Sequence, residues 1–87
     1  MHSAIVLINC DLGYEEDVIR DISKIEGVKS IVGTYGVYDL VANISSNTLQ
    51  ELNNSIAKIR KVNHVRTTVT LVVVEGQGIV HDESEYR

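Results

Sequence analysis

Residues 28–45, VKSIVGTYGVYDLVANIS, contain the pattern that decides the fold. Two segments rich in β-branched residues, 28–35 and 38–45, flank the pair Gly36-Val37. This arrangement is typical of a β-hairpin in which glycine takes the first central position of a tight turn. We therefore predict two neighbouring antiparallel strands in the middle of the chain, joined by a tight turn at Gly36-Val37.

An amphipathic helix is predicted on each side of this hairpin. Apolar residues recur at helical spacing before the hairpin, at Tyr14, Val18, Ile22 and Ile25. They recur in the same way after it, at Leu49, Leu52, Ile56 and Ile59. Asn47 and Thr48 each begin a capping-box pattern at the start of the second helix. Beyond the helices lie two apolar segments that we predict to be strands, residues 3–10 (SAIVLINC) and 65–74 (VRTTVTLVVV).

The predicted order of elements is β-α-β-β-α-β. Right-handed crossovers then give an antiparallel sheet in the order 4-1-3-2 with both helices on one face, which is a ferredoxin-like α+β sandwich. The length of 87 residues fits one small domain. We assign residues 1–75 to that domain and residues 76–87 to a polar C-terminal tail.

The predicted strands are apolar on both faces. In the first strand Ile5 and Leu7 point one way, and the residues between and around them point the other. The last strand has Leu71 on one face and Val72 on the other. Helices on one side leave a large apolar surface that is unusual for a monomer. We therefore predict a homodimer that pairs sheet against sheet as a dimeric α+β barrel.

Composition excludes several classes of function. Eight basic and 12 acidic side chains give a net charge of −4, so we predict no direct binding to nucleic acid. The longest apolar run, residues 4–8, is too short for a signal peptide or a membrane span, and we expect a cytoplasmic protein. The single cysteine cannot form an internal disulfide, and the three histidines have no metal-binding spacing. We therefore predict no metal and no cofactor.

The sequence contains no catalytic motif, and two features remain as candidates for a binding site. Tyr38 and Asp39 place a phenol and a carboxylate beside the hairpin turn. Thr68 and Thr70 share one face of the last strand, and Thr67 lies on the other. Residue types alone favour structural roles for both features, as a turn carboxylate and as β-branched strand formers.

Together with the order of elements, these residues resemble a known family. The hairpin Gly36-x-Tyr38-Asp39-Leu40, the second helix, and Arg66-x-Thr68-x-Thr70 leading into an apolar strand are similar to the effector domain of the Lrp/AsnC transcription regulators. That domain is named RAM, for regulation of amino-acid metabolism, and the resemblance covers residues 4–75. Full-length members carry an N-terminal helix-turn-helix. This chain begins at the first effector strand and so resembles the stand-alone form of the domain.

The resemblance implies a non-catalytic regulatory module that binds a free amino acid. It implies dimers that assemble into an octamer of four dimers, with the effector at the junctions between dimers. Asp39 would hold the ammonium group of the ligand, and Thr68 and Thr70 would place hydroxyls near it. Gly36 and Tyr38 would shape the surrounding loop. A role in transcriptional control would then require a DNA-binding relative as partner.

Two other functions remain open. The dimeric α+β barrel also hosts small enzymes, although the absence of Trp and Phe and the peripheral positions of the histidines count against this class. The third candidate is a purely structural interaction domain whose tail, residues 75–87, docks a partner.

Overall fold

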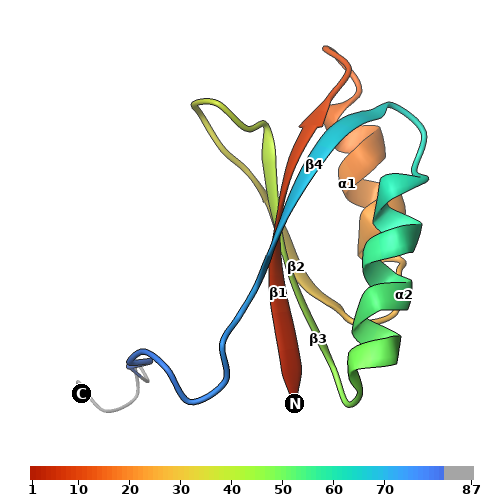
Figure 1. Ribbon diagram of the computed structural model, residues 1–87. Coiled ribbons are helices and arrows are strands. Elements are labelled where there is room, and N and C mark those ends of the chain that lie inside the picture. The colour runs from red at the N-terminus through yellow and green to blue at the C-terminus, as the bar shows by residue number, and fades with distance from the viewer. Residues whose placement is uncertain (82–87) are drawn as a thin grey trace.

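The computed structural model describes residues 1–81 of the chain. Its elements follow the predicted order: β1 (His2–Cys10), α1 (Glu15–Ser23), β2 (Val28–Gly33), β3 (Leu40–Ser46), α2 (Leu49–Arg60) and β4 (Val65–Val72). The strands form one antiparallel sheet in the order β2-β3-β1-β4, which is the predicted order read from the other edge. Both helices cover the same face of the sheet (Figure 1). The prediction of a ferredoxin-like β-α-β-β-α-β sandwich is confirmed.

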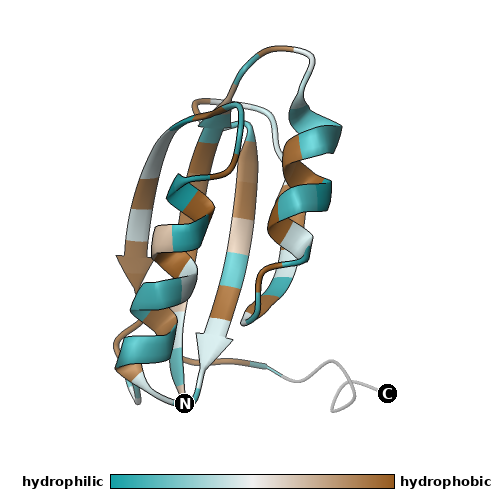
Figure 2. Cartoon of the chain, turned by 90° about the vertical axis from the view of Figure 1, so that its right-hand side faces the viewer, coloured by the Kyte–Doolittle hydropathy of each residue, from teal (hydrophilic) through white to brown (hydrophobic). Residues whose placement is uncertain are grey.

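The hydrophobic core lies between the sheet and the helices. Alternate residues of the two central strands point into it, because side chains on a strand alternate between faces. These residues are Ala4, Val6, Ile8 and Cys10 on β1, and Leu40, Ala42 and Ile44 on β3. The helices contribute Val18, Ile22, Leu52, Ile56 and Ile59. Hydrophilic and hydrophobic residues alternate along both helices, as expected of helices with one face on a core (Figure 2).

The first residue of each predicted helical stripe lies outside the core. Tyr14 is the N-cap residue of α1 and is 42% exposed, while Leu49 is 51% exposed at the start of α2. In α2 the polar residue Ser55 is buried, and its hydroxyl donates a hydrogen bond to the carbonyl oxygen of Glu26 at 2.6 Å. The hydrophobic pattern of the sequence does not predict the burial of this serine, because the burial depends on a hydrogen-bond partner that is distant in the sequence.

The connection between β2 and β3 is longer than the predicted tight turn at Gly36-Val37. The strands end and begin at Gly33 and Leu40, and residues 34–39 form a loop between them. The backbone N–H of Thr34 donates to the carbonyl oxygen of Asp39 at 2.9 Å, and its hydroxyl donates to that of Tyr38 at 2.7 Å. These two bonds close the loop. Gly36 has a φ of 124°, a conformation that side-chain-bearing residues rarely adopt.

The opposite face of the sheet is uncovered in the single chain (Figure 1). Ile5 and Leu7 of β1 lie on it, paired with Leu71 and Val69 of β4. Leu71 is 50% and Val69 40% exposed, so this face is apolar as predicted. Val72 pairs with the core residue Ala4 and therefore belongs to the helix-covered face, at the sheet edge.

Beyond β4, residues 73–81 form no helix or strand and are exposed. The rest of the predicted polar tail, residues 82–87, lies outside the described residues. Within residues 1–81, neither helix has the length and apolar character needed to cross a membrane.

Candidate functional site

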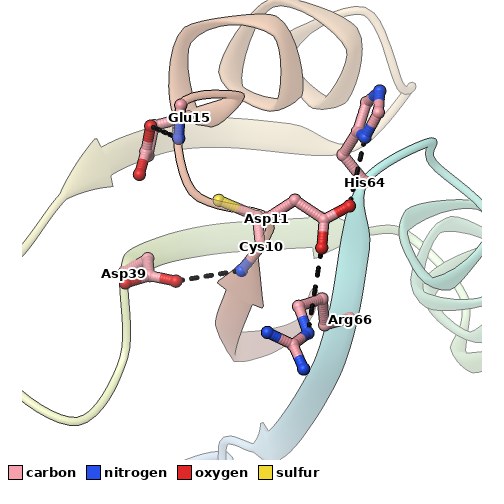
Figure 3. Close-up of polar contacts among 7 residues, drawn as sticks. Cys10, Asp11, Glu15, Asp39, His64 and Arg66 are labelled. Carbon is pink, nitrogen blue, oxygen red and sulfur yellow. Dashed lines mark hydrogen bonds and ion pairs between the residues drawn. The ribbon is translucent and has the colours of Figure 1, made fainter.

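Loop 34–39 places Asp39 beside the end of the central strand β1. The backbone N–H of Asp39 donates to the carbonyl oxygen of Ile8 at 3.0 Å. Its carboxylate atom Oδ2 accepts a hydrogen bond from the backbone N–H of Cys10, also at 3.0 Å (Figure 3). The amide that Asp39 satisfies therefore belongs to the neighbouring strand rather than to its own turn. This contact fixes the orientation of a half-buried carboxylate at one end of the sheet.

Asp39 forms part of an open pocket of about 340 Å³, which we call the Asp39–Arg66 pocket. Its other lining residues are Asn9, Cys10, Arg66 and Thr67. The side-chain amide of Asn9 donates to Oγ1 of Thr67 at 3.4 Å. The pocket thus combines a carboxylate, a guanidinium group and neutral polar groups. A ligand with both an ammonium and a carboxylate group would find a partner for each charge.

Arg66 is also held from outside this pocket by Asp11. The Arg66 Nε atom lies 3.8 Å from Asp11 Oδ1, and His64 Nδ1 lies 3.1 Å from Asp11 Oδ2, so Asp11 lies between the two (Figure 3). His64 has a φ of 73°, and its ring stacks on that of Tyr14 with centroids 3.6 Å apart. The α2–β4 loop is therefore attached to the start of α1 next to the pocket.

A second open pocket, of about 360 Å³, lies on the other side of Asp39 and is called the Glu15 pocket here. Glu15, Ile19 and Tyr35 line it together with Asp39 and Leu40. The Glu15 atom Oε1 accepts a hydrogen bond from the backbone N–H of Gly13 at 3.0 Å. Asp39 is the residue that lines both pockets.

The other predicted site residues have different positions. Thr68 and Thr70 pair with Ile8 and Val6, so their side chains lie on the helix-covered face of β4. They share one face as predicted, but it is Thr67, on the opposite face, that lines the Asp39–Arg66 pocket. A single chain therefore does not bring Thr68 and Thr70 into that pocket. Gly36 and Tyr38 lie in loop 34–39, and neither lines the two pockets that Asp39 joins.

The pKa of the Cys10 thiol reflects burial and the negative charges at this end of the sheet. Burial raises the pKa of its thiol, and the negative charges of Asp39, Glu15 and Asp11 raise it further. The thiol therefore stays protonated at neutral pH and acts as a small core side chain. Among residues 1–81, no three His, Cys, Asp or Glu side chains are arranged to hold a metal ion.

Sequence reasoning missed Asn9, Arg66 and Thr67 as pocket residues. Arg66 and Thr67 stand next to Thr68 in the sequence. The alternation of side chains along a strand, however, does not show which face of β4 lies toward Asp39. That choice depends on the pairing of Asn9 with Thr67 across the sheet.

Comparison with known proteins agrees with this architecture. Residues 3–76 match the model of the Lrp/AsnC ligand binding domain. The chain is 34% identical over 73 residues to a protein of Saccharolobus islandicus named homocitrate synthase, covering 83% of this chain and 16% of that enzyme. It thus spans a small part of this curated relative.

Two solved structures are similar over their whole length. FFRP-DM1 has a TM-score of 0.80 at 31% identity, covering 85% of this chain and 100% of that one. The hypothetical protein PHS023 from Pyrococcus horikoshii has a TM-score of 0.80 at 29% identity, covering 94% of this chain and 100% of that one. With a family model matched from end to end of the fold, this chain belongs to the Lrp/AsnC ligand-binding domain family.

Proposed function

We propose that this chain is a non-catalytic regulatory module that binds a free α-amino acid in the Asp39–Arg66 pocket. The observation that carries the proposal is the pairing of opposite charges in one pocket, Asp39 on one side and Arg66 on the other. A zwitterionic ligand needs an anionic acceptor for its ammonium group and a cationic donor for its carboxylate. Asp39 holds the ammonium group, while Arg66 and Thr67 meet the carboxylate.

Gly36 and Tyr38 contribute by shaping the loop that carries Asp39. The hydrogen bond from Thr34 to the Tyr38 carbonyl closes that loop, and the positive φ of Gly36 allows its bend. Thr68 and Thr70 are kept in the proposal as residues near the ligand, although both lie on the helix-covered face of β4, away from the Asp39–Arg66 pocket in the single chain. The Thr70 hydroxyl oxygen is shielded from solvent and faces away from the pocket, so a contact there would require β4 to move.

The test is calorimetric titration of the chain with each of the twenty amino acids. Asp39→Asn keeps the oxygen that accepts from Cys10 but removes the negative charge. A charge-assisted bond contributes about 1.5–3 kcal/mol, so the affinity should fall about 10- to 150-fold. Arg66→Gln should weaken binding in the same direction.

Asp17→Asn, which changes a carboxylate on α1 outside both pockets, is the matched control and should bind as the unchanged chain does. Absence of heat with every amino acid would refute the proposal and leave a structural interaction domain as the better reading. Equal affinity in Asp39→Asn would remove Asp39 from the site.

The proposal includes assembly with further chains. The uncovered apolar face of the sheet supports a homodimer, and we propose that four such dimers form an octamer with the ligand at their junctions. Control of transcription then runs through a DNA-binding relative, because 8 basic against 12 acidic side chains give no counterion-release contribution to DNA affinity.

A second candidate function is regulation of an enzyme rather than of transcription. It is supported by the 34% identity to a segment that makes up 16% of the Saccharolobus islandicus protein named homocitrate synthase. A domain of this kind can therefore be part of an enzyme chain. Size-exclusion chromatography distinguishes the two functions. The purified chain is mixed with a helix-turn-helix relative or with a homocitrate synthase lacking the domain, and the amino acid is added. The mixture in which the two proteins co-elute identifies the partner.

A further inference from the structure

The Glu15 pocket adjoins the proposed amino-acid site, because Asp39 lines both pockets. A ligand whose ammonium group meets Asp39 and whose carboxylate faces Arg66 can extend its side chain past Asp39 toward the Glu15 pocket. The volume of about 360 Å³ is sufficient for a long side chain.

The walls of this pocket are partly apolar. Leu40 is buried in the core, and Ile19 packs against the core from α1. Tyr35 extends from loop 34–39 at the rim, fully exposed. The partly exposed side chain of Ile19 and the exposed side chain of Tyr35 suit the methylene groups of an aliphatic ligand.

The charges of the pocket are of one sign. Glu15 and Asp39 are its ionisable acids, and none of the described residues that line it is cationic. Backbone N–H groups hold both carboxylates in place, Gly13 for Glu15 and Cys10 for Asp39 (Figure 3). Within residues 1–81, the second oxygen of Glu15, Oε2, accepts no hydrogen bond and is available to a ligand.

We propose that the amino acid bound by this chain carries a cationic side chain, as lysine, ornithine and arginine do, and that Glu15 is the residue that selects it. The proposal rests on the proposed function. Asp39 pairs with the α-ammonium group, and the aliphatic part of the side chain lies along Ile19 and Tyr35. The terminal cation pairs with Glu15. An acidic side chain would meet the carboxylate of Glu15 and be rejected.

The test compares lysine with norleucine, which has the same straight side chain without the terminal ammonium group. Calorimetric titration of the full chain should give about 10- to 150-fold tighter binding of lysine, the factor expected of a charge-assisted bond. In Glu15→Gln this preference should disappear while norleucine affinity stays unchanged, because glutamine keeps the oxygen that accepts from Gly13.

Glu16→Gln is the matched control. It removes the same charge from the same helical turn, but Glu16 is exposed and lines neither pocket. The lysine preference should persist in it. Circular dichroism of both variants checks that α1 still forms.

The two proposals fail in different ways. Asp39-dependent binding of a neutral or acidic amino acid in preference to lysine would overturn the role of Glu15 and leave the amino-acid site standing. A lysine preference that survives Glu15→Gln would also overturn it. Failure of every amino acid to bind would overturn both.

Discussion

Thr70 has a hydroxyl group that finds no hydrogen-bond partner among residues 1–81. Its Oγ1 atom is shielded from solvent and makes no hydrogen bond within the described residues. The residue pairs with the core residue Val6 on β1 and lies on the helix-covered face of the sheet. A buried hydroxyl without a partner costs about 1–3 kcal/mol, so a threonine here is a local source of instability.

Thr70→Val replaces this hydroxyl with a methyl group of similar size and should stabilise the fold by about 1 kcal/mol. Equilibrium unfolding in urea measures the change. Thr67→Val is the control, because the Thr67 hydroxyl accepts from Asn9 on the exposed face and its loss should give no gain. A less stable Thr70→Val would mean that the hydroxyl has a partner.

The same variant tests the proposed ligand contact, since unchanged amino-acid affinity would exclude Thr70 from the site.

At the scale of elements, Gly27 connects the turn after α1 to β3 and α2. Its φ is 95°, and a Cβ atom there would lie 3.0 Å from Oγ of Ser55 and 3.2 Å from the carbonyl oxygen of Ser45. The Gly27 carbonyl oxygen also accepts the backbone N–H of Ser45 at 2.9 Å. Only glycine satisfies both the backbone conformation and the close approach.

Gly27→Ala should therefore destabilise the fold by at least the roughly 1–2 kcal/mol that a left-handed conformation costs a residue with a Cβ atom. Gly33→Ala is the matched control. Gly33 has no positive φ, and a Cβ atom added there meets nothing within 4 Å, so the stability should stay the same or rise slightly. Thermal and urea unfolding of the two variants gives the comparison, and equal stabilities would contradict the structural role of Gly27.

The elements themselves could be predicted because each depends on a local pattern. The stripe through Val18 and Ile22 and the β-branched run of β4 are readable within a few residues of sequence. The site depends on contacts between residues that are far apart in the sequence. Arg66 and Asp39 share a pocket only because β1 lies between β3 and β4, and loop 34–39 is wider than a two-residue turn. The sequence motif led to Asp39 but not to Thr67, whose face is set by pairing with Asn9.

For the whole molecule, the uncovered face of the sheet is the surface through which we propose that the homodimer forms. The residues on this face include Ile5, Leu7, Val69 and Leu71. Val72, the next residue along β4, belongs to the helix-covered face, because it pairs with the core residue Ala4. Leu71 is 50% exposed and Val72 is 55% exposed. These neighbouring residues are therefore similar in exposure but lie on opposite faces of β4.

Leu71→Asp should therefore dissociate a homodimer formed through this face, because a buried unpaired charge costs several kcal/mol. Val72→Asp introduces the same charge one residue away, at the edge of the helix-covered face, and should leave the dimer intact. Multi-angle light scattering at micromolar concentration gives the mass of each variant, and urea unfolding checks that both fold. The unchanged chain should be at least twice the protomer mass of 9.6 kDa. A protomer mass for the unchanged chain, or equal dissociation in both variants, would show that the sheets do not form the contact, and the apolar face would then need a different partner.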